Sequence, residues 1–319
     1  METETVANED LNWEVIIVGG GAAGMTAAIY AARYGLKTLV LESKVLGGQQ
    51  ATSPGIENYP GFTFISGMEL ATKMKDHVKH TGAVIKEITE VKSITRPEEG
   101  GDFILATRKG DFHAKAIVFA TGGEHRHLDV PGEKEFSGRG VSYCATCDGP
   151  LFRGKKVIVV GGGNTAAVEA VYLSELTEKA SLIHRRDELR ADKASSDMVF
   201  NASVDILWSH IVKEFKGDNL LKEAVIEDLK TGEIKTIEID GAFIALGTVP
   251  ESKLAIDLGV LTNEKGEILV DAKMATNIPG FFAAGDVVET MKQISVAVGQ
   301  GAIASDSAYT YIRQKDVLQ

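Results

Sequence analysis

The sequence predicts an α/β protein in which one βαβ unit occurs twice. Each unit opens with a short apolar run rich in valine and isoleucine, continues through glycines into an alanine-rich stretch, and returns in a second apolar run. The two units are "WEVIIVGGGAAGMTAAIYAARYGLKTLVLES" (13–43) and "KKVIVVGGGNTAAVEAVYLSELTEKASLIHRRD" (155–187). The length of 319 residues suits two domains of ~150 residues, and the 34 glycines indicate many tight turns.

The first unit carries the glycine pattern of a dinucleotide-binding turn. Gly19, Gly21 and Gly24 follow the first predicted strand, and Glu42 ends the second. In such a Rossmann-like unit the glycines allow a tight turn, a close approach to a pyrophosphate and close packing of the helix on the sheet. The acidic residue accepts hydrogen bonds from ribose hydroxyls and would repel a 2′-phosphate, which favours FAD or NAD.

The second unit repeats the turn but ends its second strand with basic residues. Its turn consists of Gly161, Gly163, Asn164, Thr165 and Ala166. The basic residues are His184, Arg185, Arg186 and Arg190. Guanidinium groups bind phosphate oxygens in a fork, so this strand end predicts the 2′-phosphate of NADPH. The alternative interpretation is a solvated, basic start of a helix. Two different nucleotides in one chain indicate electron transfer between a flavin and a hydride donor.

The only two cysteines, Cys144 and Cys147, are separated by two residues and followed directly by Asp148. A Cys-x-x-Cys pair has three interpretations: half of a zinc site, a structural staple, or a redox dithiol. A zinc site needs two more ligands, and His125 and His127 are the only candidates nearby. A staple across so short a loop would add little stability. The flanking nucleotide units favour a redox dithiol and no metal.

Composition and charge exclude several classes of function. A formal net charge of −11 argues against a nucleic-acid partner. No apolar run reaches the ~18 residues needed to span a bilayer. The first dozen residues, "METETVANEDLN", hold four acids and no base, which predicts a flexible tail over 1–12 and no signal peptide. The thiols are therefore expected to be intracellular, in a cytoplasmic protein.

Together these motifs resemble the low-molecular-weight thioredoxin reductases from about Trp13 to about Gln314. The motifs that carry the resemblance are "VGGGAAG", "GGQ" (47–49), "ENYPG" (57–61), "ATG" (120–122), "CATCDG", "GGGNTA", "HRRDELRADK" and "AAGDV" (283–287). The resemblance implies a discontinuous FAD domain, 1–124 and 248–319, into which an NADPH domain, 125–247, is inserted with the cysteine pair.

The resemblance also implies roles for single residues. Further flavin-binding residues would be Gly48, Gln49, Asn58, Gly122, Gly285, Asp286, Gln293 and Ile294. Gly285 and Asp286 would lie at the ribityl or phosphate region, and Gln293 and Ile294 would begin a helix near the isoalloxazine ring. Cys147 would lie nearer the flavin, Cys144 would be the outward thiol, and Asp148 would donate and accept protons.

The expected function is NADPH-dependent reduction of the disulfide of thioredoxin or a glutaredoxin-like protein, by a homodimer. The alternatives are a flavin-dependent dithiol oxidase, a reductase with a different electron donor, and a flavin-bound regulatory protein. The sequence departs from the family pattern in "NTAAVEA", where a valine precedes Glu169. This departure leaves the coenzyme preference open.

Overall fold

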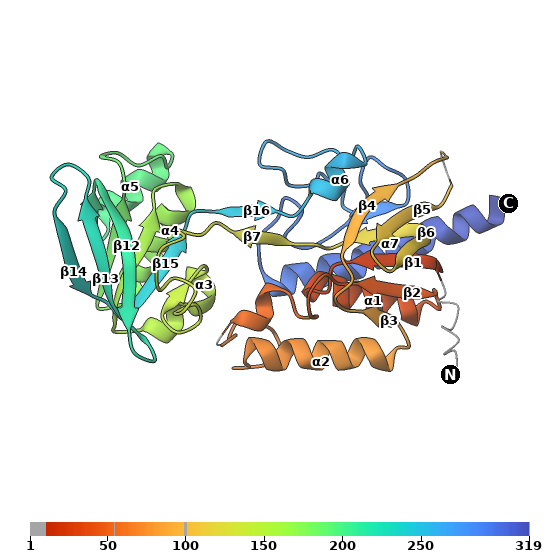
Figure 1. The fold of residues 1–319 in the computed structure, drawn as a ribbon, viewed down its shortest axis with the longest axis horizontal. Coiled ribbons are helices and arrows are strands. Elements are labelled where there is room, and N and C mark those ends of the chain that lie inside the picture. The colour runs from red at the N-terminus through yellow and green to blue at the C-terminus, as the bar shows by residue number, and fades with distance from the viewer. Residues whose placement is uncertain (1–10, 54, 99–100, 319) are drawn as a thin grey trace, which may run out of the picture. The chain divides into compact units, whose positions relative to one another are not determined.

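The computed structural model describes residues 11–53, 55–98 and 101–318 (Figure 1). It divides the chain into two compact units. Unit 1 comprises Met1–Ala51, Gly67–Glu124 and Pro250–Gln319, and unit 2 comprises Thr52–Ser66 and His125–Val249. Most of the predicted tail lies outside the described residues, but Asn12 already belongs to the first strand, where it pairs with His113.

Unit 1 is built on a seven-stranded sheet in the order β3-β2-β1-β6-β5-β4, with β17 paired to β6. Its strands are β1 (Asn12–Val18), β2 (Thr38–Leu41), β3 (Val84–Lys86), β4 (Val91–Thr95), β5 (Phe103–Thr107), β6 (Gly110–Phe119) and β17 (Phe281–Ala283). The pairs among β3, β2, β1, β6 and β17 are parallel, whereas β4 and β5 add antiparallel pairs. The first predicted βαβ unit is therefore confirmed as β1, α1 (Ala22–Arg33) and β2.

Three phenylalanines from different strands contact one another in the unit 1 core. Phe103, Phe119 and Phe281 are fully buried, and the ring centroid of Phe281 lies 6.1 Å from that of Phe103 and 5.4 Å from that of Phe119. Each aromatic side chain removes a large apolar area from water. These contacts join β17, near the end of the chain, to β5 and β6.

Two helices of unit 1 approach each other through a glycine. The remaining helices of this unit are α2 (Gly67–His80), α6 (Lys253–Asp257) and α7 (Ile294–Leu318), and η1 (Gln49–Thr52) is a short 3₁₀ turn. A Cβ on Gly301 of α7 would lie only 2.2 Å from the carbonyl oxygen of Ala23 in α1. The Ser305 hydroxyl donates to the Ala27 carbonyl at 2.6 Å. The C-terminal helix is thus packed directly on the first nucleotide-turn helix.

Unit 2 contains a five-stranded parallel sheet in the order β11-β10-β9-β15-β8. Its strands are β8 (Val141–Ser142), β9 (Lys156–Gly161), β10 (Lys179–His184), β11 (Val204–Trp208) and β15 (Gly241–Ala245). Its helices are α3 (Ala145–Asp148), α4 (Asn164–Leu176) and α5 (Lys193–Asn201), and the 3₁₀ turn η2 (Gly149–Phe152) follows α3. The second predicted βαβ unit is confirmed as β9, α4 and β10.

The parallel sheet of unit 2 is covered on both faces. Val157 and Val159 of β9 belong to a core cluster with residues of α4, whereas Ile158 and Val160 belong to a cluster with a second sheet. That sheet is antiparallel and consists of β12 (His210–Gly217), β13 (Leu221–Asp228) and β14 (Ile234–Glu238). Burial on both faces explains why β9 reads as a continuous apolar run.

The chain passes between the units four times, and the strands at the last two crossings, β7 (Gly123–His125) and β16 (Thr248–Pro250), pair with each other. The predicted α/β class with parallel sheets is confirmed. Across residues 11–53, 55–98 and 101–318, no helix is both long enough and apolar enough to span a membrane.

The contact between α7 and α1 predicts opposite effects for two nearby glycine substitutions. Gly301→Ala should lower the free energy of unfolding of unit 1 by ~1–3 kcal/mol, because the new methyl group overlaps a backbone carbonyl that cannot easily move. Gly299→Ala is the control: a Cβ there meets nothing within 4 Å, and alanine favours the helix by up to ~1 kcal/mol. Urea unfolding followed by Trp13 fluorescence in a Trp208→Phe background measures both. Equal effects of the two substitutions would contradict the close packing.

Candidate redox and nucleotide sites

The glycine turn between β1 and α1 depends on the absence of side chains. Gly19 has a φ of +105°, and a Cβ on it would lie 2.3 Å from the carbonyl oxygen of Ala120. A Cβ on Gly24 would lie 1.9 Å from the carbonyl oxygen of Gly19. The helix N-cap, Gly21, provides no side-chain cap for α1. The first-turn N–H groups of α1 are therefore not occupied by a capping side chain, as phosphate binding requires.

The Glu42 carboxylate accepts a hydrogen bond from the backbone of this turn. Its Oε2 accepts a hydrogen bond from the Gly20 N–H at 2.7 Å, and its Oε1 accepts one from the Lys44 N–H at 2.6 Å. A Cβ on Gly48 would lie 2.9 Å from the Cα of Gly21. The predicted residues Gly19, Gly21, Gly24, Glu42 and Gly48 thus lie together around one backbone turn.

The other predicted flavin-binding residues are spread over several elements. Gly285 follows β17, and its N–H donates to the Gln300 side chain at 2.9 Å. The side chain of Asp286 is half-buried, and burial raises its pKa against the attraction of Lys292. Gly122 lies before β7, Gln49 lies in η1, and Gln293 and Ile294 form the start of α7. Asn58 lies in Thr52–Ser66, a segment of unit 2.

The second glycine turn lies between β9 and α4 and has the same uncapped helix start. Gly163 is the N-cap of α4 without a side-chain cap, and a Cβ on it would meet nothing within 4 Å. Gly161 must be a glycine, because its Cβ would lie 2.6 Å from the carbonyl oxygen of Ala245 and 2.7 Å from the Cβ of Ala166. The predicted residues Asn164 and Thr165 begin the helix.

Asn164 connects the second turn to the basic segment after β10. Its amide Nδ2 donates to Asp192 at 2.7 Å, and its Oδ1 accepts the Asp192 backbone N–H at 2.8 Å. The Arg190 N–H donates to the Gly162 carbonyl at 2.7 Å. These contacts fix the segment around Arg190 and Asp192 beside the start of α4.

The four basic side chains differ in their exposure. Arg185, Arg186 and Arg190 are exposed, whereas His184 is only 5% exposed. A Cβ on Gly162 would lie 2.1 Å from the His184 ring, so this ring packs directly under the glycine turn. Burial lowers the pKa of His184. His184 therefore packs against the turn, whereas the three arginines present their charges to solvent.

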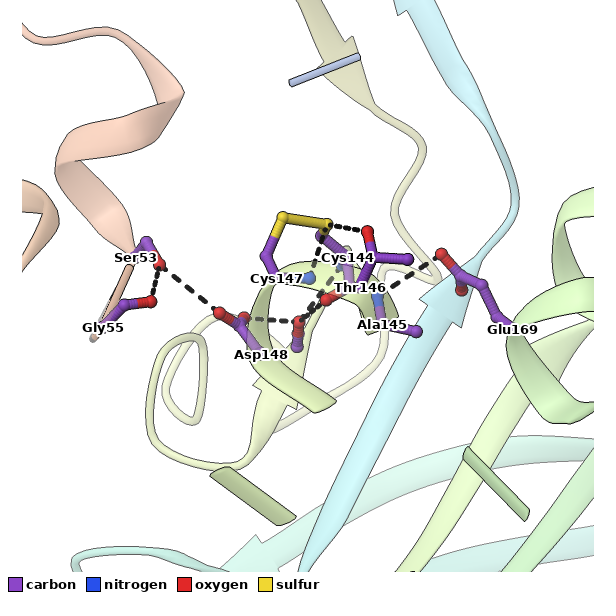
Figure 2. The surroundings of a disulfide bond; sticks show 9 residues. Ser53, Gly55, Cys144, Ala145, Thr146, Cys147, Asp148 and Glu169 are labelled. Carbon is purple, nitrogen blue, oxygen red and sulfur yellow. Dashed lines mark hydrogen bonds between the residues drawn. A yellow bond between two sulfur atoms is a disulfide. The ribbon is translucent and has the colours of Figure 1, made fainter. Parts of the chain in front are cut away.

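The two cysteines form a disulfide with each other at the start of α3 (Figure 2). Their Cα atoms are 5.3 Å apart. Cys144 is the N-cap of α3, and its Sγ accepts a hydrogen bond from the Cys147 N–H at 3.2 Å. Since β8 ends at Ser142, the pair lies just beyond the carboxyl end of a parallel strand, where sites of α/β sheets usually form.

Asp148 is a buried carboxyl held by two hydroxyls, and Figure 2 shows its contact with Ser53. Ser142 donates to Oδ2 at 2.6 Å and Ser53 donates to Oδ1 at 3.3 Å. Ser142 also accepts the Cys144 N–H at 3.1 Å, which connects the carboxyl to the cysteine backbone. Burial raises the pKa of Asp148, and the hydrogen bonds from Ser142 and Ser53 oppose this rise. A carboxyl of this kind can carry a proton closer to neutral pH than an exposed aspartate.

A second half-buried carboxyl, Glu169 of α4, lies at the other end of α3. Its Oε1 accepts a hydrogen bond from the Ala145 N–H at 3.4 Å. Burial raises the pKa of Glu169 to about 7, against the effect of that hydrogen bond. The disulfide thus has one acid at each end of its short helix.

The two histidines considered as zinc ligands pack instead around Tyr143. The His125 ring stacks on Tyr143 with centroids 5.1 Å apart, and His127 Nδ1 lies 2.8 Å from the tyrosine hydroxyl. Tyr143 in turn donates to Glu133 at 3.0 Å. Among the described residues, no group of three or more His, Cys, Asp or Glu side chains could hold a metal ion.

This geometry matches a known family over most of the chain. A family model described as pyridine nucleotide-disulphide oxidoreductase matches residues 13–301. The chain belongs to this family. Thioredoxin reductase of Bacillus subtilis (strain 168) is 42% identical over 315 residues, which cover 96% of this chain and 97% of the relative. Thioredoxin reductase of Treponema pallidum (strain Nichols) is 42% identical over 313 residues, 97% of this chain and 99% of the relative.

Solved structures lead to the same assignment. The crystal structure of thioredoxin reductase from Streptococcus pyogenes MGAS5005 matches with a TM-score of 0.90 at 40% identity, covering 95% of this chain and 99% of that chain. The resemblance to thioredoxin reductases is therefore confirmed, together with the class of enzyme, a flavin-dependent disulfide oxidoreductase that uses FAD and NADPH.

Three side chains near the disulfide were not predicted from the sequence: Ser53, Ser142 and Glu169. Ser53 and Ser142 gave no signal, because serines are common and only the packing shows that these two contact Asp148. Glu169 did give a weak signal, since it is an acid within the apolar stretch "TAAVEAV" of a helix. A charged residue at such a position is expected to be partly buried and to have a specific partner.

The two hydroxyls on Asp148 predict unequal effects on its pKa. Ser142→Ala should raise this pKa further, because it removes a donor at 2.6 Å that favours the carboxylate. Ser53→Ala is the matched control with a smaller rise, because the Ser53 hydroxyl has a nearer acceptor in the Gly55 carbonyl at 3.0 Å. Infrared difference spectra against an Asp148→Asn variant titrate the protonated carboxyl band.

The same substitution affects the pH dependence of stability. The pKa of folded Asp148 lies above its ordinary value. The protonated Asp148 carboxyl therefore adds to the free energy of unfolding at low pH, and this contribution is lost as the pH rises through the folded pKa. Ser142→Ala should therefore lose this stability over a wider range of pH than the unmodified protein. A lowered Asp148 pKa in the Ser142→Ala protein would contradict the assignment.

Proposed function

We propose that this protein reduces the disulfide of thioredoxin, or of a similar small redox protein such as a glutaredoxin-like protein, with electrons from NADPH. The observation that carries the proposal is the disulfide between Cys144 and Cys147 at the first turn of α3, next to the buried carboxyl of Asp148. A disulfide that closes so short a loop stabilises little and is suited to exchange.

The two glycine turns fit the two nucleotides. The turn around Gly19, Gly21, Gly24 and Gly48, with Glu42, would hold FAD, because its uncapped amides suit a pyrophosphate and its acid suits a ribose. The turn around Gly161 and Gly163, with the exposed arginines, would hold NADPH. When bound, NADPH and FAD would together supply the two electrons that reduce the Cys144–Cys147 disulfide.

The residues of this chain then perform thiol–disulfide exchange. The Cys144 thiolate attacks one sulfur of the partner disulfide, and the partner thiolate that leaves takes up a proton. Cys147 next attacks the sulfur of Cys144 in the mixed disulfide, which releases the second partner thiolate and restores the Cys144–Cys147 bond. The partner gains two electrons and two protons. We assign to Asp148 the exchange of protons with the two thiols.

The location and assembly of the protein follow as proposals from the same features. We propose a cytoplasmic enzyme, because the donor is NADPH and the only two cysteines form a redox pair rather than a framework. We also propose a homodimer. Tyr30 and Tyr34 of α1 are 42% and 37% exposed, and the Tyr34 ring stacks on Tyr309 of α7 at 4.9 Å. Exposed aromatic rings of this kind are common at subunit contacts.

The exposed arginines predict the coenzyme preference. Replacing Arg185 and Arg186 together by glutamine should raise the KM for NADPH strongly and leave the KM for NADH almost unchanged, since hydrogen bonds to a charged phosphate contribute roughly 1.5–3 kcal/mol each. Anaerobic titration of the flavin absorbance with each nucleotide, together with steady-state kinetics, measures this. A preference of the unmodified protein for NADH would contradict the assignment. Indifference to both nucleotides would instead support a dithiol oxidase or a different electron donor.

Single cysteine variants test the division of labour within the pair. Cys147→Ser should abolish turnover but leave Cys144 able to trap a partner as a stable mixed disulfide, because the resolving thiol is absent. Cys144→Ser should abolish turnover without trapping the partner. Reaction of each variant with an activated thioredoxin, followed by non-reducing electrophoresis, separates the two. Efficient trapping by Cys144→Ser alone would reverse the roles, and full activity of either variant would refute the redox function.

A further inference from the structure

Glu169 contacts the redox helix directly but has no part in the exchange described above. Its Oε1 accepts the N–H of Ala145, the residue that follows Cys144 and begins α3 (Figure 2). That N–H belongs to the peptide group between Cys144 and Ala145, and Ala145 is completely buried. The carboxyl is therefore joined to the backbone of Cys144 through a peptide that has little room to move.

The two acids near the disulfide are held in different ways. Asp148, at the last residue of α3, receives hydroxyl donors from Ser142 and Ser53. Glu169 approaches the first residue of α3 from α4 and receives a backbone donor. Burial raises the pKa of Glu169 to about 7, so that its charge changes in the range where thiols also ionise.

The charge of Glu169 opposes the ionisation of the neighbouring thiol. The N–H groups of the first turn favour a thiolate at the N-cap, and the Cys147 N–H already points at the Sγ of Cys144. A carboxylate on the adjacent Ala145 N–H occupies one such donor and adds a negative charge beside the thiolate. A protonated carboxyl keeps the hydrogen bond without this charge, and the coupling acts equally in both directions.

We propose that Glu169 is a positioning residue for the outward thiol: it holds the peptide between Cys144 and Ala145, and its protonation makes the Cys144 thiolate easier to form. This inference rests on the proposed function only in naming Cys144 as the outward thiol. The protonated Glu169 carboxyl thus favours the Cys144 thiolate, which is the attacking form, whereas the ionised carboxyl disfavours its formation.

Other titratable side chains near α3 must remain unchanged in a test. They are Asp148 on α3, Tyr143 at the end of β8, and Tyr172 on α4, whose ring atom lies 3.0 Å from the position of a Cβ on Gly149. Glu175, the second acid of α4, is exposed and provides a matched control on the same helix. Glu169→Gln keeps an acceptor oxygen for Ala145 but cannot ionise, and Glu169→Ala removes both functions.

The test is the rate of iodoacetamide alkylation of Cys144 as a function of pH, in the FAD-loaded Cys147→Ser protein. In the Cys147→Ser protein, which is the background for the other substitutions, the plot of alkylation rate against pH should show two inflections, one from the Cys144 thiol and one from the Glu169 carboxyl. Adding Glu169→Gln should remove the inflection of the carboxyl, lower the pKa of Cys144, and raise the rate near neutral pH on the order of threefold. Glu175→Gln should leave the profile of the background unchanged.

Two outcomes would overturn the inference. One is a Glu169→Gln profile that coincides with that of Glu175→Gln, and the other is slower alkylation of Glu169→Gln near neutral pH. Glu169→Ala tests whether Glu169 positions the peptide between Cys144 and Ala145. This substitution should lower the limiting rate of Cys144 alkylation at high pH, whereas Glu169→Gln should leave that limiting rate unchanged. Equal limiting rates for both variants would refute positioning, and if the alanine variant does not fold, the glutamine variant still tests the charge. Alkylation requires neither NADPH nor a partner protein, so failure of this test is distinct from failure of the proposed function.

Discussion

The close approach of backbone at the two glycine turns is the constraint on which the nucleotide sites depend. In unit 1 the helix α1 can begin where it does only because Gly24 has no Cβ to collide with the carbonyl of Gly19. In unit 2 the start of α4 carries Ala166 at the position of Gly24, and the close approach lies at Gly161, where a Cβ would meet the Ala245 carbonyl oxygen of the neighbouring strand and the Cβ of Ala166. A methyl group at either position would push the helix away from the sheet. Both turns thereby present helix amides that no side chain caps.

The redox centre uses the same edge of a parallel sheet for a different chemistry. β8 ends at Ser142, and the short helix that follows places Cys144 at its N-cap and Asp148 at its last residue. Burial raises the pKa of the acids at both ends of α3, and each retains a hydrogen bond that limits the rise. Proton transfer and thiolate formation near neutral pH both need groups of this kind. The donors to these carboxyls come from β8, from α3 and from the segment Thr52–Ser66 of unit 2.

Much of the fold and of the candidate sites was predictable because their signals are local. The period of apolar residues, the glycine spacing and the basic residues after β10 all lie within short stretches, and the structure forms both expected βαβ units. The exposure of His184 was not predictable from the sequence. Its position beside Arg185 suggested a phosphate ligand, but His184 is still part of β10 and its ring is buried against Gly162, whereas the arginines follow the strand and are exposed.

The sequence by itself determined where the turns, the helix starts and the cysteine pair occur, because backbone conformation at these points depends on neighbouring residues and on the absence of Cβ atoms. Only the tertiary structure decided which side chains surround the disulfide. Ser53 reaches Asp148 across 95 residues of sequence, and Glu169 reaches Ala145 across 24. Such contacts depend on how whole elements pack, and the pKa of a carboxyl depends on burial that the packing creates.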